Sequence, residues 1–301
     1  MMIEENVILK QFTTFKCGGP ARYFAEPEST KDLIELFGYA RDNDLKVLIL
    51  GLGSNMLISD KGFDGLVIRI GKKMGDITVE DDGEYKIVTA SAGCSLALFG
   101  SRCASEGLEG AEFCCGIPGT IGGAVFMNAG AYGREVKDIA VEVTYLLDNE
   151  VHTVNSDDCD FGYRKSIFEQ MDKEGRQPVI LSLKARLKKG DMEKIRSYVT
   201  ELKEKRCASQ PIDVPSAGST FKRPEGHYAG ALIEGSGLKG FALDDSGAQV
   251  SPKHAGFVVN NGGKASAADV MRLIRYIQDK VYKDSGVRLE TEVRLIGGDG
   301  N

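Results

Sequence analysis

The sequence predicts an α+β fold divided into more than one domain. Strand and helix signals alternate in residues 1–70, hairpin signals dominate residues 77–190, and longer helical segments appear from residue 191 onward. With 301 residues, 42% hydrophobic and 27% charged, the chain is long enough to bury a substantial core and to divide into two or three domains. We therefore expect domains at residues 1–70, 71–190 and 191–301.

The first segment predicts a small α/β unit. Ser29 and Thr30 precede apolar residues at helical spacing, which are Leu33, Ile34, Phe37 and Ala40. An apolar run at 47–50 predicts a buried strand that leads directly into G-L-G-S-N-M at 51–56, and 66–70 predicts another strand. A glycine-rich loop directly after a strand is a position from which a ligand can be bound.

The remaining chain predicts hairpins first and helices later. A hairpin is expected at 77–79 and 85–89, a helix at 95–104 ended by Gly107, a second hairpin at 141–147 and 151–154 with its turn at 148–150, and a strand at 179–187. An amphipathic helix at 191–206 has four residues expected to face inward, Ile195, Tyr198, Val199 and Leu202. We expect a helix at 228–233, a strand at 257–259, a helix at 267–282 and a final strand at 287–296.

Composition excludes several function classes. A net charge of −6 and a pI near 5.3 argue against a nucleic-acid partner. No stretch is apolar enough for a membrane span, and the first residues lack the basic and apolar regions of a leader. The seven cysteines include no C-x-x-C and the three histidines are scattered, so neither disulfides nor a metal are expected. These observations predict a cytoplasmic protein, which we expect to be a monomer.

The densest glycine run in the chain is G-I-P-G-T-I-G-G-A-V-F-M-N-A-G-A-Y-G at 116–133. Glycines leave the main chain bare, so that successive N–H groups can approach an anion such as a diphosphate, although a set of tight turns has the same composition. The second loop at 51–56 favours anion binding. Neither loop is a common nucleotide motif, since Met56 replaces the third glycine of a dinucleotide loop and no G-x-x-x-x-G-K-[ST] occurs.

Three other segments contain candidate chemistry. Arg164 lies in F-G-Y-R-K-S at 161–166, although an isolated arginine is more often a surface residue. Ser219 lies in P-S-A-G-S-T-F-K at 215–222; without a nearby histidine or G-x-S-x-G it fits a proton donor, with Lys222 to stabilise the alkoxide, better than a hydrolase nucleophile. In the last segment a period of two places Arg288, Glu290, Glu292 and Arg294 on one face, which is either functional or an exposed charge ladder.

The loops P-G-T-I-G-G-A at 118–124, N-A-G-A-Y-G at 128–133 and G-L-G-S-N-M-L at 51–57 resemble the FAD-binding half of the UDP-N-acetylenolpyruvoylglucosamine reductase family. The resemblance implies a two-part FAD-binding region of the vanillyl-alcohol-oxidase type, a C-terminal substrate domain, non-covalent FAD with its diphosphate across both loops, and NADPH as hydride donor. The implied cofactor-binding residues are Gly51, Gly53, Ser54, Asn55, Met56, Leu57, Gly116, Pro118, Gly119, Thr120, Gly122, Gly123 and Asn128.

The same resemblance implies the catalytic residues. The family patterns G-Y-R-x-S-I-F, A-G-S-x-F-K and L-E-x-E-V-R place an arginine on Arg164, a serine proton donor on Ser219 and a glutamate on Glu292. The resemblance extends from about Asn6 to Gly297, and the sequence resembles the shorter subtype of the family. The implied substrate contacts are Tyr132, Arg164, Arg206, Lys222, Arg223 and His254. At two of these positions the family often differs, with asparagine in place of Arg223 and, in longer members, glutamine in place of His254.

The resemblance implies NADPH-dependent reduction of UDP-N-acetylglucosamine enolpyruvate to UDP-N-acetylmuramate, a step of peptidoglycan precursor and cell-wall synthesis. Arg164 would pair with the substrate carboxylate, Glu292 would hydrogen-bond the developing charge, and Ser219 would protonate C2. Two alternatives stay open: a flavin oxidase of a sugar or alcohol, and a flavin- or nucleotide-binding regulator without turnover. Cys114 and Cys115 precede the main loop and could anchor a flavin covalently, but packing is the favoured interpretation.

Overall fold

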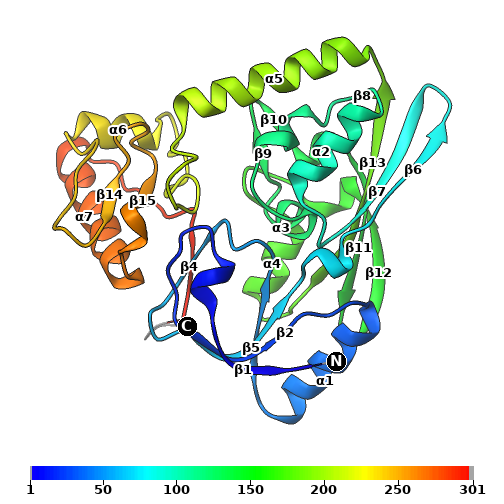
Figure 1. Ribbon diagram of the computed structural model, residues 1–301, viewed down its shortest axis with the longest axis horizontal. Coiled ribbons are helices and arrows are strands. Elements are labelled where there is room, and N and C mark those ends of the chain that lie inside the picture. Colours follow the sequence, from blue (N-terminus) through cyan, green and yellow to red (C-terminus); the bar gives the residue numbers. More distant parts are fainter. Residues whose placement is uncertain (1, 298–301) are drawn as a thin grey trace. The chain divides into compact units, whose positions relative to one another are not determined.

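The computed structural model describes residues 2–297 and has a mixed helix and strand content (Figure 1). The predicted α+β class is confirmed. The chain forms two compact units: unit 1 contains Ala25–Leu52 and Ile68–Lys205, and unit 2 contains Ile3–Phe24, Gly53–Val67 and the described residues from Arg206 onward. The division at 1–70, 71–190 and 191–301 stays a prediction, and residue 1 and residues 298–301 at its ends lie outside the described part.

Unit 1 is organised around an antiparallel sheet. Its strand order is β12-β11-β13-β7-β6, with β8 also paired to β13. The two predicted hairpins are present. In the second, Leu147 faces Glu150, and the two loop residues Asp148 and Asn149 have φ of 52° and 65°, the left-handed values that suit a two-residue hairpin turn. The sheet strands are β6 (Ile77–Asp82), β7 (Tyr85–Ser91), β8 (Leu108–Glu109), β11 (Ala140–Leu147), β12 (Glu150–Asn155) and β13 (Val179–Lys189).

Short helices and a small hairpin complete unit 1. Ser29 caps α1 as predicted, with its side chain accepting from the Asp32 N–H, and α3 packs on β13 and β7. Phe168 of α4 is fully buried, with its ring edge-on to Tyr145 at a centroid distance of 5.2 Å. The elements are α1 (Thr30–Asp42), β3 (Lys46–Leu50), α2 (Leu96–Ser105), α3 (Ile121–Phe126), β9 (Gly130–Ala131), β10 (Arg134–Glu135) and α4 (Ile167–Lys173).

The long helix α5 (Met192–Ser209) follows β13. Ile195 and Leu202 are buried on it, as predicted, but Tyr198 is 42% exposed, so its inward placement was wrong. An aromatic side chain with a polar end tolerates this position, since the hydroxyl group remains hydrated.

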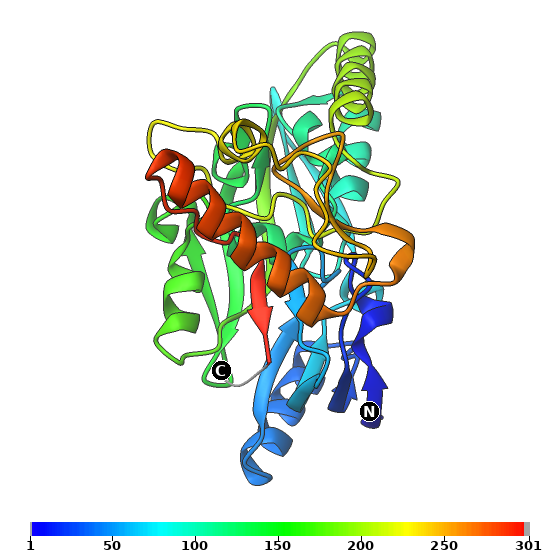
Figure 2. The ribbon, with the colours of Figure 1, turned by 90° about the vertical axis from the view of Figure 1, so that its left-hand side faces the viewer.

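Unit 2 contains several short strands and the helix α7 (Ala267–Ser285), which is coloured orange to red in Figure 2. Ser266 and Asp269 form a capping box at its start, and Gly286 ends it with φ of 73°. The strands pair as β1 with β2, β14 with β15 and, in parallel, β4 with β16. The elements are β1 (Glu4–Ile8), β2 (Pro20–Ala25), β4 (Met56–Ile58), β5 (Phe63–Arg69), α6 (Ala229–Gly235), β14 (Ala248–Val250), β15 (Val258–Asn260) and β16 (Arg294–Ile296).

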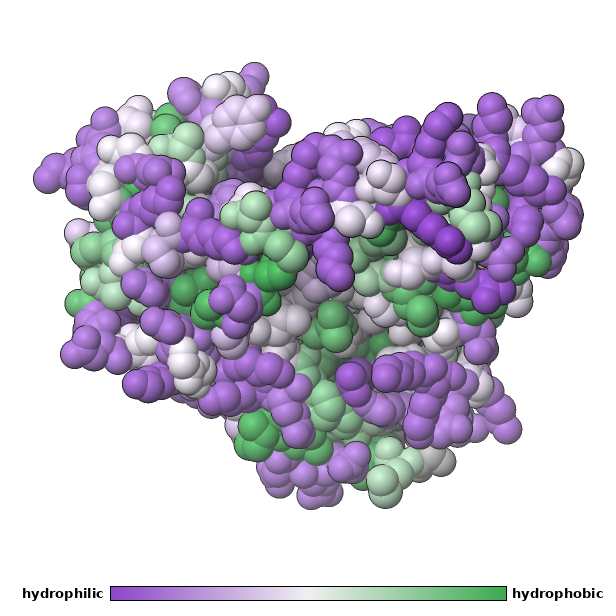
Figure 3. Space-filling view, turned by 45° about the horizontal axis from the view of Figure 1, so that its top comes forward, coloured by the Kyte–Doolittle hydropathy of each residue, from purple (hydrophilic) through white to green (hydrophobic). Residues whose placement is uncertain are grey.

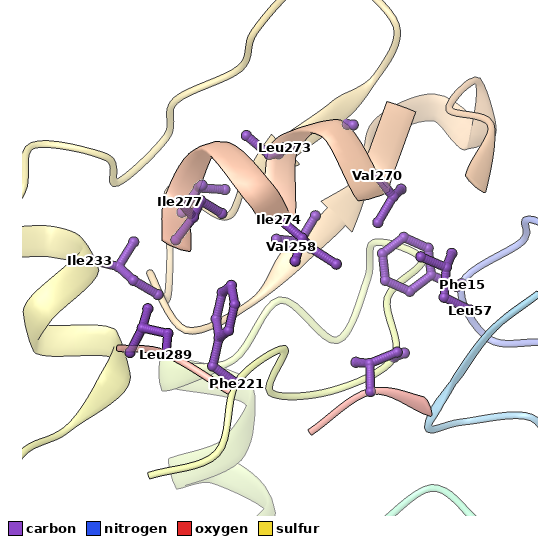
Figure 4. Close-up of a cluster of buried hydrophobic side chains, with 14 of the residues drawn as sticks. Phe15, Leu57, Phe221, Ile233, Val258, Val270, Leu273, Ile274, Ile277 and Leu289 are labelled. Atoms are coloured by element: carbon purple, nitrogen blue, oxygen red, sulfur yellow. The ribbon is translucent and has the colours of Figure 1, made fainter. Parts of the chain in front are cut away.

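The core of unit 2 gathers residues from distant parts of the sequence. One face of α7 buries Val270, Leu273, Ile274, Ile277 and Val281 at helical spacing. Figure 4 shows side chains of this face together with Phe15, Leu57, Phe221, Ile233 and Leu289, all of which belong to the same buried cluster. The core therefore joins residues 15 and 57 to the C-terminal segment.

The predicted final strand at 287–296 was wrong over most of its length, because only Arg294–Ile296 is a strand. The alternation that suggested it is nevertheless real, since Leu289 and Val293 are buried while Arg288 and Glu290 are exposed. The segment from 287 to 293 is irregular, and it is joined to another irregular segment by an isolated bridge, Phe221 with Thr291. Period-two burial thus occurs without a regular ladder.

The surface of the molecule is mostly polar on the face viewed in Figure 3, with scattered apolar side chains. Among residues 2–297, none of the helices combines the length and apolar character that a membrane span requires. The same part of the chain contains no cluster of three or more His, Cys, Asp or Glu side chains suited to a metal ion.

Candidate active site

The two glycine-rich loops approach each other at Gly51 in unit 1. β3 leads directly into Gly51, and Thr120 caps α3 with its Oγ1 accepting from the Gly123 N–H at 3.4 Å. A Cβ atom added to Gly51 would lie 2.5 Å from Thr120 Oγ1, too close for any larger residue without a shift. Since Gly123 is exposed and Gly51 is half-buried, bare main chain from both loops is accessible to a ligand.

Main-chain hydrogen bonds hold the start of α3 in place. The N–H groups of Ile121 and Gly122 donate to the carbonyls of Cys94 and Ala92, at 2.8 and 2.9 Å. A Cβ on Gly122 would lie 3.2 Å from the Ala92 Cβ. Glycine at position 122 therefore allows the loop to pack closely against Ala92. At least one glycine of the loop is thus explained by packing and not by anion binding.

Cys114 and Cys115, which precede this loop, have environments typical of residues that pack in a protein interior. Cys114 is fully buried, and burial raises the pKa of its thiol well above the usual value; burial also raises the pKa of the Cys115 thiol. A thiol with a raised pKa is a poor nucleophile, because the reactive species is the thiolate. These environments favour the packing interpretation over a covalent flavin anchor.

Arg164 lies in a tight turn of unit 1. Gly162 and Lys165 each donate their N–H to the other's carbonyl, at 3.1 and 3.2 Å, and Arg164 between them has φ of 52°. Its Nη2 donates to the carbonyl of Gly130 at 3.2 Å, and its guanidinium carbon lies 5.1 Å from the centroid of the Tyr163 ring. The predicted catalytic arginine therefore adjoins the end of the predicted cofactor loop.

Asn128 and Ser166 make further bonds between the same two segments. The Asn128 side chain is fully buried and donates to Gly162 O at 2.9 Å and to Glu135 Oε2 at 3.0 Å, while its Oδ1 accepts from Lys137 N–H at 3.0 Å. Ser166 caps α4 and donates its hydroxyl to Phe126 O at 2.5 Å. Ser166 was not a predicted site residue, although the S-x-x-E spacing to Glu169 is a sequence signal for a helix start.

Tyr132 was predicted to contact substrate. It lies between β9 and β10 with φ of 56° and is 40% exposed, and its hydroxyl donates to Leu202 O of α5 at 3.1 Å. This hydrogen bond connects the β9–β10 hairpin to α5.

In unit 2, the loop around Asn55 adjoins the predicted catalytic glutamate. Asn55 Nδ2 donates to Glu292 O at 3.1 Å, and Arg294 N–H donates to Asn55 O at 3.0 Å. Gly53 has φ of 65°, and a Cβ on it would lie 2.4 Å from Phe12 O. Position 53 therefore requires glycine, both for its positive φ and for the space it leaves. Leu57 is 2% exposed and lies within the core of unit 2.

The Ser219 segment runs beside Glu292. Glu292 N–H donates to Thr220 O and Lys222 N–H donates to Glu290 O, both at 2.9 Å. Thr220 is buried, with its Oγ1 accepting from Val258 N–H at 2.9 Å, while Ser219 is exposed. Main-chain bonds thus place Ser219 and Glu292, predicted from motifs about 70 residues apart, on neighbouring segments.

The other predicted substrate residues of unit 2 have identifiable partners. Lys222 Nζ lies 3.3 Å from Glu290 Oε2, and the Arg223 guanidinium carbon lies 4.0 Å from the centroid of the Tyr228 ring. His254 Nδ1 accepts from Gly256 N–H at 3.1 Å, which places its proton on Nε2, and burial lowers the pKa of the ring. Arg206 lies in the last turn of α5 and is half-buried.

Comparison with known proteins defines the class to which this fold and these loops belong. Residues 21–154 match the family model described as an FAD binding domain, a range that includes both glycine-rich loops. Residues 210–296 match the model described as the C-terminal domain of UDP-N-acetylenolpyruvoylglucosamine reductase. The chain is thus an FAD-binding protein with a second, separately recognised domain.

Relatives identify the family. A UDP-N-acetylenolpyruvoylglucosamine reductase of Agathobacter rectalis is 46% identical over 298 residues, covering 96% of this chain and 92% of that protein. A relative of the same description in Caldanaerobacter subterraneus subsp. tengcongensis is 42% identical, covering 97% and 93%. The crystal structure of the reductase from Thermus caldophilus matches with a TM-score of 0.83 at 33% identity, over 99% of this chain and 100% of that one. The chain belongs to the UDP-N-acetylenolpyruvoylglucosamine reductase family.

Proposed function

We propose that this protein catalyses the NADPH-dependent reduction of UDP-N-acetylglucosamine enolpyruvate to UDP-N-acetylmuramate through bound FAD. The observation that carries the proposal is the hydrogen-bonded arrangement of Asn55, Glu292 and Thr220, in which the segments of Ser219 and Glu292 are neighbours, in a chain of this family. A UDP-sugar is the small-molecule substrate, and the reaction is a step of peptidoglycan precursor synthesis.

The residues present fit FAD. The main chain at Gly51 and Gly123 is accessible and carries no Cβ atom. A Cβ would collide with Thr120 at Gly51 and would cover the main chain at Gly123, so glycine at both positions lets a diphosphate approach the N–H groups. Main-chain groups of the two loops, at 51–57 and 116–123, would hold the cofactor. Bound FAD would supply the hydride chemistry that links NADPH to C3 of the enolpyruvyl group.

Arg164 would bind the substrate carboxylate. A planar guanidinium pairs with a carboxylate through two charge-assisted hydrogen bonds, and this pairing strengthens as negative charge builds up on the atoms conjugated to the carboxylate. Its Nη2 donates to Gly130 O, which holds the guanidinium beside the glycine-rich loop.

Ser219 and Glu292 would complete the reaction. Addition of hydride at C3 leaves an electron pair on C2, and the Ser219 hydroxyl would transfer its proton to that carbon. Glu292 would hydrogen-bond the substrate carboxylate in the state in which charge has developed. The products balance, with one hydride at C3 and one proton at C2 converting the enolpyruvyl ether into a lactyl ether.

We also propose that the protein is cytoplasmic and acts as a monomer without a nucleic-acid partner. All seven cysteines are free thiols, which suits a reducing compartment, and the net charge of −6 does not provide the basic face that nucleic acids require.

An anaerobic absorbance titration tests the proposed function. NADPH should bleach the flavin bands of the purified protein, and one equivalent of the enolpyruvyl nucleotide should restore them without oxygen. Bleached flavin that oxygen restores and the nucleotide does not would support a flavin oxidase instead. A protein that binds no flavin, or that holds flavin and reacts with neither, would support a binding protein without turnover.

A further inference from the structure

Three hydrogen bonds join alternate residues of the glycine-rich loop at 116–133 to the segment that carries Arg164. Ser166 donates to Phe126 O at 2.5 Å, Asn128 donates to Gly162 O at 2.9 Å, and Arg164 donates to Gly130 O at 3.2 Å. We call these three bonds the clasp. Since Asn128 and Ser166 are both fully buried, water cannot replace their bonds without opening the loop.

The clasp holds backbone that is unfavourable by itself. Arg164 and Asn128 have φ of 52° and 45°, in the left-handed region that residues with a Cβ atom rarely adopt. Such conformations are unfavourable and persist only where the surroundings over-determine them. Two main-chain bonds join Gly162 and Lys165 across the turn, and the bonds from Asn128 and Arg164 connect this turn to the glycine-rich loop.

Asn128 has no side-chain N–H group left for a ligand. Its two amide hydrogens go to Gly162 O and Glu135 Oε2, and its oxygen accepts from Lys137. The Glu135 carboxylate is in turn 2.9 Å from Lys137 Nζ, so the asparagine sits within a closed polar network. Its position in the cofactor loop motif therefore does not require contact with the cofactor.

We propose that Asn128 is a positioning residue for Arg164: through the clasp it fixes the turn from which the guanidinium reaches the substrate carboxylate. This inference rests on the proposed function for the role of Arg164, but the mechanical link between Asn128 and the turn can be tested without turnover. It assigns to Asn128 a role in substrate reduction and none in reduction of the flavin by NADPH.

The primary test is Asn128→Asp, which keeps the shape, removes both N–H donors and sets a carboxylate beside Glu135. Hydrogen–deuterium exchange of the amides of Gly162 and Lys165 should become faster than in the wild type, while exchange in α1 is unchanged. FAD content and the rate of flavin reduction by NADPH should be retained. Reoxidation by the enolpyruvyl nucleotide should slow by about 10- to 100-fold, the effect of a small misplacement of a catalytic group.

A double-mutant cycle separates positioning from general damage. In an Arg164→Ala background, Asn128→Asp should slow reoxidation by less than about 3-fold, because its effect acts through a side chain already removed. Multiplicative effects in the double variant, or unchanged exchange at 162 and 165, would overturn the proposal. So would loss of FAD with normal reoxidation of the flavin that remains, since that result identifies a cofactor contact.

Ser166→Ala provides a second route if the buried aspartate prevents folding. It removes the bond to Phe126 O and one helix cap, so its matched control is Ser29→Ala, which removes a similar cap from α1. Faster exchange at 162 and 165 in the first variant alone supports the clasp; equal exchange in both variants overturns it. If the wild-type flavin is not reoxidised by the nucleotide, the proposed function fails, and the exchange experiment still decides whether the clasp holds the turn.

Discussion

The two groups of candidate catalytic residues are held in place by different kinds of bonds. In unit 1, side chains hold the Arg164 turn, namely those of Asn128, Ser166 and Arg164 itself. In unit 2, the segments of Ser219 and Glu292 are joined mainly by main-chain groups, with Glu292 N–H donating to Thr220 O. Because main-chain bonds do not depend on side-chain identity, Ser219 should be replaceable without structural damage, whereas residues around Arg164 should not.

Among variants that test this difference between the two units, Ser219→Ala should have the largest effect on the rate of reaction. Reoxidation of reduced flavin by the enolpyruvyl nucleotide should fall by about 10²- to 10⁴-fold, the usual contribution of a general acid. The melting temperature should not change, since the Ser219 side chain is exposed. Stopped-flow absorbance and a thermal melt measure both quantities. A normal reoxidation rate would remove Ser219 from the mechanism, and a large loss of stability would contradict the contrast between the two units.

A pair of glycine variants tests how strictly the main chain of the loops is defined. Gly53 and Gly133 both have positive φ, at 65° and 80°, but only a Cβ on Gly53 would collide, lying 2.4 Å from Phe12 O. Gly133→Ala should reduce the free energy of unfolding by about 1 kcal/mol through backbone strain alone. Gly53→Ala should reduce it by about 2 kcal/mol or more, because it adds a clash with the main chain. Equal losses in urea unfolding would show that Phe12 moves away freely.

Removal of a single side-chain hydrogen bond in unit 1 should have a smaller effect. Tyr132→Phe deletes the bond from the tyrosine hydroxyl to Leu202 O and leaves the ring in place. We expect a loss of about 1 kcal/mol in the free energy of unfolding, the net value of one such bond. If Tyr132 contacts the substrate as its motif implies, the KM for the nucleotide rises as well; a change in stability alone would assign it to the hairpin.

The smallest effect concerns pH in unit 2. Burial lowers the pKa of His254, so the unfolded chain binds a proton at a higher pH than the folded chain does. Stability is therefore fully present above the unfolded pKa of about 6.5 and decreases as pH falls below it. His254→Gln should lose less stability than the wild type between about pH 6.5 and 5, as measured by urea unfolding. Parallel pH profiles would show that the histidine is not the responsible group.

Periodicity and capping signals predicted the regular elements well. Ser29 marked the start of α1, the alanine at 267 began α7, and both long hairpins were placed within a few residues. The final strand was misplaced because alternation records which side chains are buried, and in this chain an irregular segment held by isolated bonds buries alternate residues as a strand does. Helix α4 was missed because it is short, although Ser166 and Glu169 carry a start signal.

Motifs located the candidate site more readily than physical patterns did. Arg164, Ser219 and Glu292 were chosen from family patterns, and nothing in their local composition separates them from surface residues. The bonds among Asn128, Gly162 and Ser166 join segments more than 30 residues apart, so no local signal could have revealed the clasp. The role of a buried polar side chain becomes visible only when its partners are known.

The most direct test of the proposed reaction is the position of hydrogen atoms in the product. Turnover with unlabelled NADPH in D₂O, followed by NMR of the isolated nucleotide, should show one deuterium at C2 of the lactyl group and at most one in its methyl group, because the N–H hydrogen of reduced flavin exchanges with the solvent. Deuterium at C2 requires that this carbon is protonated from an exchangeable group such as the Ser219 hydroxyl. Deuterium in the methyl group with protium at C2 would contradict the assignment of the two steps, and the absence of a lactyl ether would contradict the proposed reaction.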